Sequence, residues 1–258
     1  MNAADPRTGF RPIDLDELVS RAELLRRVDR KYVLAARDLP AFLGGLPAQT
    51  RILDIGGRRA FGYRSVYFDT PGLDSYLASA HRRRRRFKVR IRSYVETGAR
   101  YAEVKLRGLR STTVKERVPY HGSEQELGPE AWTHVDEVLV TAGLRPDRLS
   151  LAPALTTRYR RTTLFLPATG SRLTVDEDVT WVLPDGTARL LPHHVIVETK
   201  SERAGAPVDR LLWSMRHRPC PVSKYATGLA ALRPDLPANR WQPLLRRHIA
   251  PATEEKKP

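Results

Sequence analysis

The stretch that decides the expected fold is residues 87–92, which read Phe87-Lys88-Val89-Arg90-Ile91-Arg92. Apolar and basic residues alternate strictly along it. Because successive side chains of a β-strand point to opposite faces, this alternation predicts a strand with one apolar face and one basic face.

The same alternation recurs at residues 101–107, 114–118, 172–176 and 195–200. Lys and Arg dominate the charged faces, and Glu and Asp are a minority. Ranges with helical spacing separate the strands: 13–27, 38–46, 125–142, 208–217 and 226–232. We therefore expect an α+β fold in which about eight strands form a closed antiparallel β-barrel tunnel, with a charged lumen and flanking helices. The simpler alternative is a half-buried antiparallel sheet whose charged faces contact water.

The net charge indicates a polyanionic partner. Lys plus Arg total 45 and Asp plus Glu total 29, which gives a formal charge of +16. Arg is the usual cation of this chain, and only eight residues are Lys. The ammonium group is a compact charge that suits phosphate oxygens. Six of these lysines lie in the body of the chain: Lys31, Lys88, Lys105, Lys115, Lys200 and Lys224.

Length and composition predict one domain. We expect a flexible N-terminus over residues 1–10, a single domain over 11–250 and a disordered tail over 251–258. The single cysteine, Cys220, excludes an intramolecular disulfide and a Cys-rich zinc module. No apolar run approaches the length of a bilayer span, and the first ten residues lack the apolar core of a secretory signal. We therefore expect a cytoplasmic location.

The order and spacing of nine short segments resemble the VTC domain, the polyphosphate polymerase domain of the vacuolar transporter chaperone complex. The resemblance covers roughly residues 20–235, and the domain is one of the triphosphate tunnel metalloenzymes. The segments are Arg30-Lys31-Tyr32, Ser65-Val66-Tyr67-Phe68-Asp69-Thr70, Phe87-Lys88-Val89-Arg90-Ile91-Arg92-Ser93-Tyr94, Glu103-Val104-Lys105, Val114-Lys115-Glu116-Arg117, Tyr159-Arg160-Arg161-Thr162, Arg172-Leu173-Thr174-Val175-Asp176, Val197-Glu198-Thr199-Lys200 and Ser223-Lys224-Tyr225.

The resemblance implies a set of basic residues that contact phosphate during catalysis. Lys200 joins this set because it shares the charged face of its strand with Glu198. Arg161 and Lys224 depend on the resemblance alone, and Arg160 competes with Arg161 for the position. The expected catalytic residues are Lys31, Arg90, Arg92, Lys105, Lys115, Arg161, Arg172, Lys200 and Lys224.

The resemblance also implies a divalent metal, Mn²⁺ or Mg²⁺, held by Glu198, with Asp176 or Glu103 as secondary ligands. Carboxylate oxygens suit both ions. The structural alternative is that Glu103 and Glu198 only form ion pairs with neighbouring arginines.

A second set of residues is expected to bind substrate. Arg84 and Arg86 belong to it because they lie four and two positions before Lys88 and would share its face of a strand. The run 82–86 is equally consistent with a solvated basic surface. A tyrosine such as Tyr32 is more often part of the core or the rim. The expected substrate-binding residues are Lys88, Arg84, Arg86, Arg117, Tyr32 and Ser223.

These features predict an enzyme that transfers the γ-phosphate of ATP onto a growing inorganic polyphosphate chain. Related tunnel hydrolases begin with Glu-x-Glu-x-Lys, whereas this chain has Arg27 at the first position, which favours the polymerase. Two alternatives remain. One is a hydrolase of inorganic triphosphate, polyphosphate or nucleoside triphosphate; the other is a non-catalytic module that binds a polyanion or nucleic acid. Scarce aromatic residues and the absence of a nucleic-acid-binding motif disfavour nucleic acid. Pyrophosphate and triphosphate are further expected ligands, and the resemblance allows for a separate membrane-protein partner.

Overall fold

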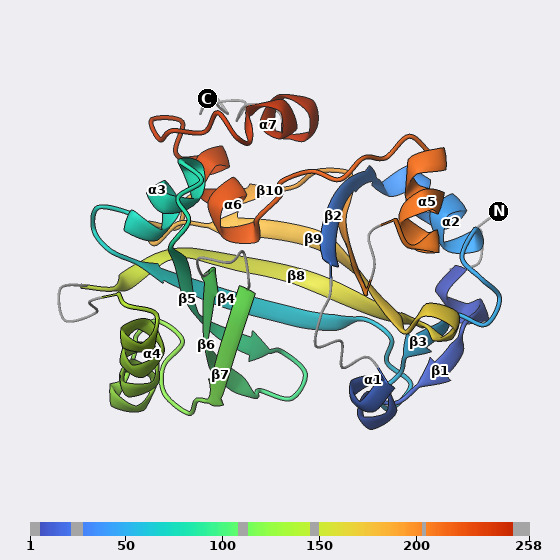
Figure 1. Ribbon diagram of the computed structural model, residues 1–258, viewed down its shortest axis with the longest axis horizontal. Helices are drawn as coiled ribbons and strands as arrows, with labels where there is room; N and C mark the ends of the chain where they lie inside the picture. Colours follow the sequence, from blue (N-terminus) through green and yellow to red (C-terminus); the bar gives the residue numbers. More distant parts are fainter. Residues whose placement is uncertain (1–5, 22–27, 108–112, 145–149, 203–204, 250–258) are drawn as a thin grey trace, which may run out of the picture. The chain divides into compact units, whose positions relative to one another are not determined.

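The computed structural model describes residues 6–21, 28–107, 113–144, 150–202 and 205–249 (Figure 1). The fold is mixed α+β, with a large antiparallel sheet and flanking helices, as expected. The chain divides into two compact units. Unit 1 comprises residues 1–61, 160–179 and 191–222, and unit 2 comprises residues 62–159, 180–190 and 223–258.

Unit 1 contains the strand order β2-β11-β9-β8, to which β3 and β1 add at β8. Strands β8 and β9 contribute residues 160–166 and 171–179 to this unit. Its strands are β1 (Arg11–Ile13), β2 (Val28–Ala35), β3 (Arg51–Leu53), β8 (Ala152–Leu166), β9 (Ser171–Val182) and β11 (His194–Ser201), and its helices are α1 (Leu15–Arg21), α2 (Leu39–Gly44) and α5 (Pro207–Ser214).

The core of unit 1 lies between the apolar face of its strands and helices α2 and α5. Phe42 of α2 and Leu212 of α5 are fully buried there. They pack with side chains that alternate along the strands, such as Leu34, Leu173 and Val197. The apolar half of the alternation therefore lies under helices, which leaves the charged half on the opposite face.

Unit 2 contains the strand order β8-β4-β5-β6-β7. Residues 152–159 of β8 belong to it, and β10 pairs with the end of β9. Its further strands are β4 (Phe61–Asp69), β5 (Arg86–Tyr94), β6 (Arg100–Arg107), β7 (Thr113–Pro119) and β10 (Ala188–Leu190), and its helices are α3 (Asp74–Ala80), α4 (Pro129–Thr141), α6 (Lys224–Leu232) and α7 (Gln242–His248).

Helix α4 covers the apolar face of unit 2. Its buried residues Ala131, Val135 and Leu139 recur every four positions and so form one stripe along the helix. This stripe packs on side chains such as Val89 and Val104 of the sheet. The apolar face of residues 87–92 is therefore buried, as the alternation predicts.

The expected closure of the sheet into a barrel is not found. Among the described strands the hydrogen-bonded order begins at β2 and ends at β7, and no pairing joins these two. The outer edge of β2 has another partner, because Cys220 donates a backbone hydrogen bond to the carbonyl oxygen of Lys31 at 2.8 Å. A residue outside the sheet thus takes up a hydrogen-bonding position on the strand edge that barrel closure requires.

The helix predictions are largely confirmed, with shifted ends. Helix α1 occupies the first part of 13–27, and residues 22–27 lie outside the described part of the chain. Helices α3 and α7 were not predicted. Of the two expected flexible ends, residues 6–9 form a 3₁₀ helix, whereas residues 1–5 and 251–258 are not described. None of the described helices is long and apolar enough to cross a bilayer.

Candidate functional site: two charged sheet faces

Strand register brings charged residues of unit 1 onto one face of its sheet. Lys31 of β2 lies opposite Glu198 of β11, and Glu198 in turn lies opposite Thr174 of β9. Two residues along β11, Lys200 lies opposite Arg172. Because residues directly opposite in antiparallel strands share a face, these five side chains form one group.

The centre of this group is an ion pair between Lys31 and Glu198. Lys31 Nζ lies 3.1 Å from Glu198 Oε1. Glu198 raises the pKa of Lys31, and this effect outweighs the opposing effect of burial. Beside the pair, the buried hydroxyl of Thr174 has no hydrogen-bond partner among the described residues. An unpaired buried hydroxyl is costly without a partner, so it indicates a place for a polar ligand.

Lys200 is the most perturbed lysine of unit 1. Glu198 raises the pKa of Lys200, but burial and the positive charges of Arg172 and Arg161 outweigh it and lower the pKa to about 7. The ammonium group therefore loses its proton near neutral pH unless an anion stabilises it.

The structure distinguishes Arg161 from its neighbour. Arg161 Nε and Nη2 donate to the two carboxylate oxygens of Asp176 at 2.6 and 2.9 Å. Asp176 is fully buried on the charged face. Arg160 is exposed and, being the adjacent strand residue, points to the other face. Arg161 is thus the residue that joins the unit 1 group.

Unit 2 has its own charged face, centred on Glu103. This carboxylate is 2% exposed. Arg90 donates to Glu103 Oε2 from Nε at 2.7 Å and from Nη2 at 2.5 Å, and Lys115 Nζ donates to Oε1 at 2.8 Å. Arg92 Nη1 lies 3.7 Å from the same oxygen, Oε1. Burial alone raises the pKa of Glu103, but these three cations outweigh burial and hold it well below its usual range.

Lys115 responds in the opposite direction. Burial, together with the positive charges of Arg90 and Arg92, lowers the pKa of Lys115 to about 8, although Glu103 opposes the shift. The positive charges of this face therefore exceed what Glu103 neutralises.

Two aromatic stacks position the basic residues of unit 2. Arg90 Nη1 donates to the hydroxyl of Tyr67 at 2.8 Å, and the Tyr67 ring stacks on Tyr225 of helix α6. Tyr225 in turn donates a hydrogen bond to the buried carboxylate of Asp69.

The second stack explains the position of Lys224, which sequence alternation did not predict. Lys224 Nζ lies 4.4 Å from the centroid of the Tyr159 ring. Tyr159 stacks on Tyr63 with centroids 5.2 Å apart, and the Arg92 guanidinium lies over Tyr63 at 5.6 Å. Cations on aromatic faces are stabilised electrostatically, so the stack holds Lys224 and Arg92 as one group.

Ser223 connects the start of helix α6 to strand β5. Its hydroxyl accepts a hydrogen bond from Lys88 Nζ at 2.8 Å and caps the helix by accepting from the Ala226 amide at 3.3 Å. The hydroxyl thereby fixes Lys88 beside the N-terminus of α6, and that N-terminus favours anions.

Of the remaining expected residues, some lie on the charged face of unit 2, one precedes its strand, and one lies in the core of unit 1. Lys105 lies on β6 opposite both Lys88 and Lys115 and therefore shares their face. Arg117 lies opposite Glu103, with its guanidinium 4.9 Å from the Tyr101 ring centroid.

Arg86 begins β5 on the charged face, whereas Arg84 is exposed and precedes the strand. Tyr32 joins neither group. It is fully buried under the helices of unit 1, and its hydroxyl donates to Asp209 Oδ1 at 2.8 Å.

Cations of the protein itself engage the three expected metal ligands to different extents. Among the described residues there is no group of three or more His, Cys, Asp or Glu that is able to hold a metal by itself. Asp176 is engaged by Arg161, and Glu103 by three cations. Glu198 forms an ion pair of 3.1 Å with Lys31, and the unpaired Thr174 hydroxyl lies opposite it. Glu198 therefore fits Mg²⁺ or Mn²⁺, because such ions take one or two carboxylates together with substrate phosphates.

Sequence reasoning missed Tyr63 and Tyr159 as parts of the site. The available signal was the spacing of two that places strand residues on one face. Tyr159 is two residues before Arg161, and Tyr63 lies opposite Tyr94, which is two residues after Arg92. The sequence does not show which cations stack on these two rings, because stacking depends on the pairing of distant strands.

The pattern of the VTC domain matches residues 26–233. No match to a curated protein was found. Among solved structures, the chain is similar to a putative adenylyl cyclase from Hippeastrum described as having a dominant triphosphatase activity, with 16% identity, a TM-score of 0.45, and coverage of 78% of this chain and 94% of that chain.

Two further structures are similar at lower scores. A protein from Pyrococcus horikoshii has 14% identity and a TM-score of 0.40, with coverage of 74% of this chain and 88% of that chain. A putative adenylate cyclase from Vibrio parahaemolyticus has 11% identity and a TM-score of 0.37, with coverage of 74% and 83%.

Proposed function

The chain belongs to the VTC domain family, and from this premise we propose that it is a metal-dependent polyphosphate polymerase. In the proposed reaction, a terminal oxygen of a polyphosphate chain attacks the γ-phosphorus of ATP. One phosphorus–oxygen bond forms, the bond between the γ-phosphorus and the β–γ bridging oxygen breaks, and ADP leaves with that oxygen. The chain grows by one phosphoryl group.

The observation that carries this proposal is the excess of positive charge on one face of β5, β6 and β7. Among the described residues of these strands, the only carboxylate on that face is Glu103. Its cationic side chains are Arg86, Lys88, Arg90, Arg92, Lys105, Arg107, Lys115 and Arg117. Positive charges held together on one face repel one another, so an anionic ligand of high charge density stabilises them.

The residues present suit phosphoryl transfer because this reaction needs positioning and charge neutralisation rather than a protein nucleophile. Arg90 and Arg92 are held by Glu103 and by aromatic rings, so their guanidinium groups are oriented before substrate binds. Lys88, Lys105 and Lys115 supply ammonium groups for phosphate oxygens.

The unit 1 group supports the same chemistry. Lys31, Lys200 and Arg172 are its proposed phosphate ligands, and Arg161 orients Asp176 beside them. Glu198 is the proposed ligand for Mn²⁺ or Mg²⁺. When bound, the ion supplies neutralisation of the donor phosphates.

The test is incubation of the purified protein with ATP and Mn²⁺, with products separated on a polyphosphate gel. We expect a ladder of long chains. Glu198→Gln and Lys31→Ala should each reduce chain synthesis by roughly 100-fold. The control is Arg37→Ala, because Arg37 is an exposed arginine outside both charged faces.

The other outcomes are equally clear. Release of phosphate from added triphosphate without chain growth identifies a hydrolase and contradicts the polymerase. If neither product forms, and DNA binds equally well to the Glu198 and Lys31 variants, the protein is a nucleic-acid-binding module.

A further inference from the structure

The charged face of unit 2 continues beyond the three lysines. Successive rungs of the sheet pair Arg90 with Glu103, Lys88 with Lys105, and finally Arg86 with Arg107. Same-face residues of a strand are two positions apart, or about 7 Å. The basic face therefore extends by one further rung at the end where β5 begins and β6 ends.

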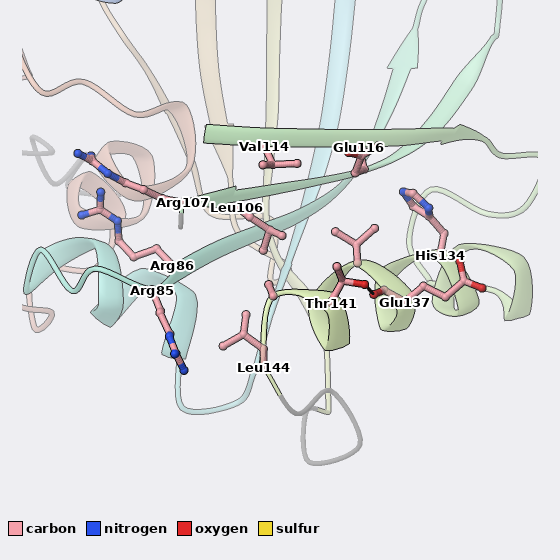
Figure 2. Close-up of a pocket in the computed structure, with 12 residues that line it drawn as sticks. Arg85, Arg86, Leu106, Arg107, Val114, Glu116, His134, Glu137, Thr141 and Leu144 are labelled. Carbon is pink, nitrogen blue, oxygen red and sulfur yellow. Dashed lines mark hydrogen bonds between the residues drawn. The ribbon is translucent and has the colours of Figure 1, made fainter. Parts of the chain in front are cut away.

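The last rung consists only of arginines. Figure 2 shows the guanidinium groups of Arg86 and Arg107 next to each other, whereas Arg85 points in the opposite direction. Burial and the positive charges of Arg107 and Arg240 lower the pKa of Arg86. A neighbouring carboxylate would have the opposite effect.

Two arginines outside the sheet join this rung. The pKa of Arg240 is lowered by burial and by the positive charges of Arg82 and Arg107. Arg240 Nη1 donates to the carbonyl oxygen of Ser79 at 3.2 Å, which fixes its side chain at the end of helix α3. Within the described part of the chain, none of these four arginines forms an ion pair with a carboxylate.

We propose that Arg82, Arg86, Arg107 and Arg240 form a second anion site that binds distal phosphoryl groups of a long polyphosphate chain. This inference rests on the proposed function, because it names the part of the substrate that the remote end of the basic face binds. A short substrate fills the rungs around Glu103 and the lysines, and only a longer chain reaches the arginines.

The side chains around this site favour polyphosphate over nucleic acid. Binding of single-stranded nucleic acid combines basic residues with exposed aromatic rings on which the bases stack. The aromatic neighbours here are buried: Trp241, on which the Arg240 guanidinium lies, is 1% exposed, and Tyr76 is fully buried. The site therefore offers charge without a stacking surface, which suits a chain of phosphates with no bases.

The test compares the affinities of triphosphate and of long-chain polyphosphate by titration calorimetry. The variant Arg107→Ala/Arg240→Ala removes two of the four charges. Its matched control is Arg83→Ala/Arg85→Ala, which removes two charges from exposed arginines of the adjacent run. We expect the first variant to bind long polyphosphate at least about tenfold more weakly. Its affinity for triphosphate should fall far less, because a short substrate fills the rungs around Glu103 and the lysines.

Three results would overturn the second site: unchanged affinity for long chains, an equal loss in the control, or an equal loss for triphosphate. Competition by single-stranded DNA as strong as that by polyphosphate would also overturn it. Because Arg240 is bonded to Ser79, the single variant Arg107→Gln separates loss of binding from loss of folding, since the Arg107 side chain is exposed.

Failure of this site is distinguishable from failure of the proposed function. If the wild type makes polymer and Arg107→Ala/Arg240→Ala binds long chains normally, the second site is wrong and the polymerase stands. If no polymer forms but long chains still bind through Arg107 and Arg240, the site stands and the polymerase is wrong.

Discussion

Lys115 Nζ lies 2.8 Å from Glu103 Oε1, and the two side chains are unequally exposed: 35% for Lys115 and 2% for Glu103. The carboxylate thus lies beneath the ammonium group and anchors it from one side. An ammonium group has three donors, and Glu103 accepts from one of them. The buried acid of this face therefore acts as a support for the cations that are proposed to bind phosphate.

Glu103→Gln tests this role. The variant leaves the charges of Arg90, Arg92 and Lys115 without their common counter-ion, and breaking a buried ion pair from one side typically costs about 3–5 kcal/mol. We expect the free energy of unfolding, measured with urea, to fall by about 3 kcal/mol. Affinity for triphosphate should rise, because one negative charge has been removed from the face.

The control for this prediction is Glu116→Gln, since Glu116 is exposed on the opposite face of β7. Glu116→Gln should change neither the free energy of unfolding nor the affinity for triphosphate. If Glu103→Gln instead weakens binding only when Mn²⁺ is present, Glu103 is a metal ligand and its role as a support is wrong.

The lowered pKa of Lys200 predicts a pH dependence of both binding and stability. The pKa in the folded protein is about 7, below its ordinary value of 10.5. The proposed polyphosphate ligand needs the protonated form of Lys200, so its affinity should fall as the pH rises from 7 to 9, and binding at pH 8 should take up protons. Calorimetry in buffers of different ionisation enthalpy measures this uptake.

The stability of the fold should change with pH in the opposite direction to the affinity. Between pH 7 and about 10 the unfolded state binds more protons at Lys200 than the folded state, so this residue makes stability rise with pH over that range. Lys200→Arg should remove the contribution of this residue to both effects. Proton uptake that is unchanged in Lys200→Arg would contradict the assignment.

Tyr32 provides a test of a residue expected to bind substrate but found in the core. Its hydroxyl bonds to Asp209, which also accepts from the Thr199 hydroxyl at 2.7 Å. Tyr32→Phe should lower the free energy of unfolding by about 1 kcal/mol, and Asp209→Asn by about 3 kcal/mol because it leaves Arg30 unpaired. Triphosphate affinity should be unchanged in both variants. A loss of affinity in Tyr32→Phe without a loss of stability would restore the substrate role.

Gly228 tests the packing beneath helix α6, which carries Lys224. A Cβ atom at this position would lie 2.2 Å from Cδ1 of Trp181, a fully buried ring. Gly228→Ala should therefore destabilise the protein by about 2 kcal/mol in thermal or urea unfolding. Gly44→Ala is the control, because a Cβ atom there meets nothing within 4 Å. Equal stability of the two variants would contradict the packing described for α6.

The sequence was sufficient to predict which strand residues share a face. A period of two fixes side-chain direction in any strand, so Glu198 and Lys200 were correctly placed on one face of their strand before their partners were known, whereas Lys31 was assigned from the resemblance. Helical spacing also predicted a helix over 125–142, and the structure has α4 there, because the spacing of apolar residues along one helix face needs no tertiary information.

Closure of the sheet was wrong for a physical reason. Alternation determines the faces of a strand, but it does not determine what covers the edges. Cys220, which donates to the edge of β2, lies between Pro219 and Pro221 in a stretch without a strand pattern, so the sequence did not predict this contact. The aromatic stacks were missed for a similar reason, since stacking of Tyr159 on Tyr63 depends on the pairing of distant strands.

The rarity of lysine in this chain has a chemical consequence. All six lysines of the described residues belong to the two charged faces or to the start of α6, while arginine serves almost everywhere else. An amine-acylating reagent would therefore modify the lysines proposed to bind phosphate and leave most of the remaining basic surface unmodified. Lys200 and Lys115, whose lowered pKa values leave more of the free amine, should react first near pH 8. The lysines that a bound ligand protects from the reagent, identified by mass spectrometry, would then show which parts of the two charged faces the ligand contacts.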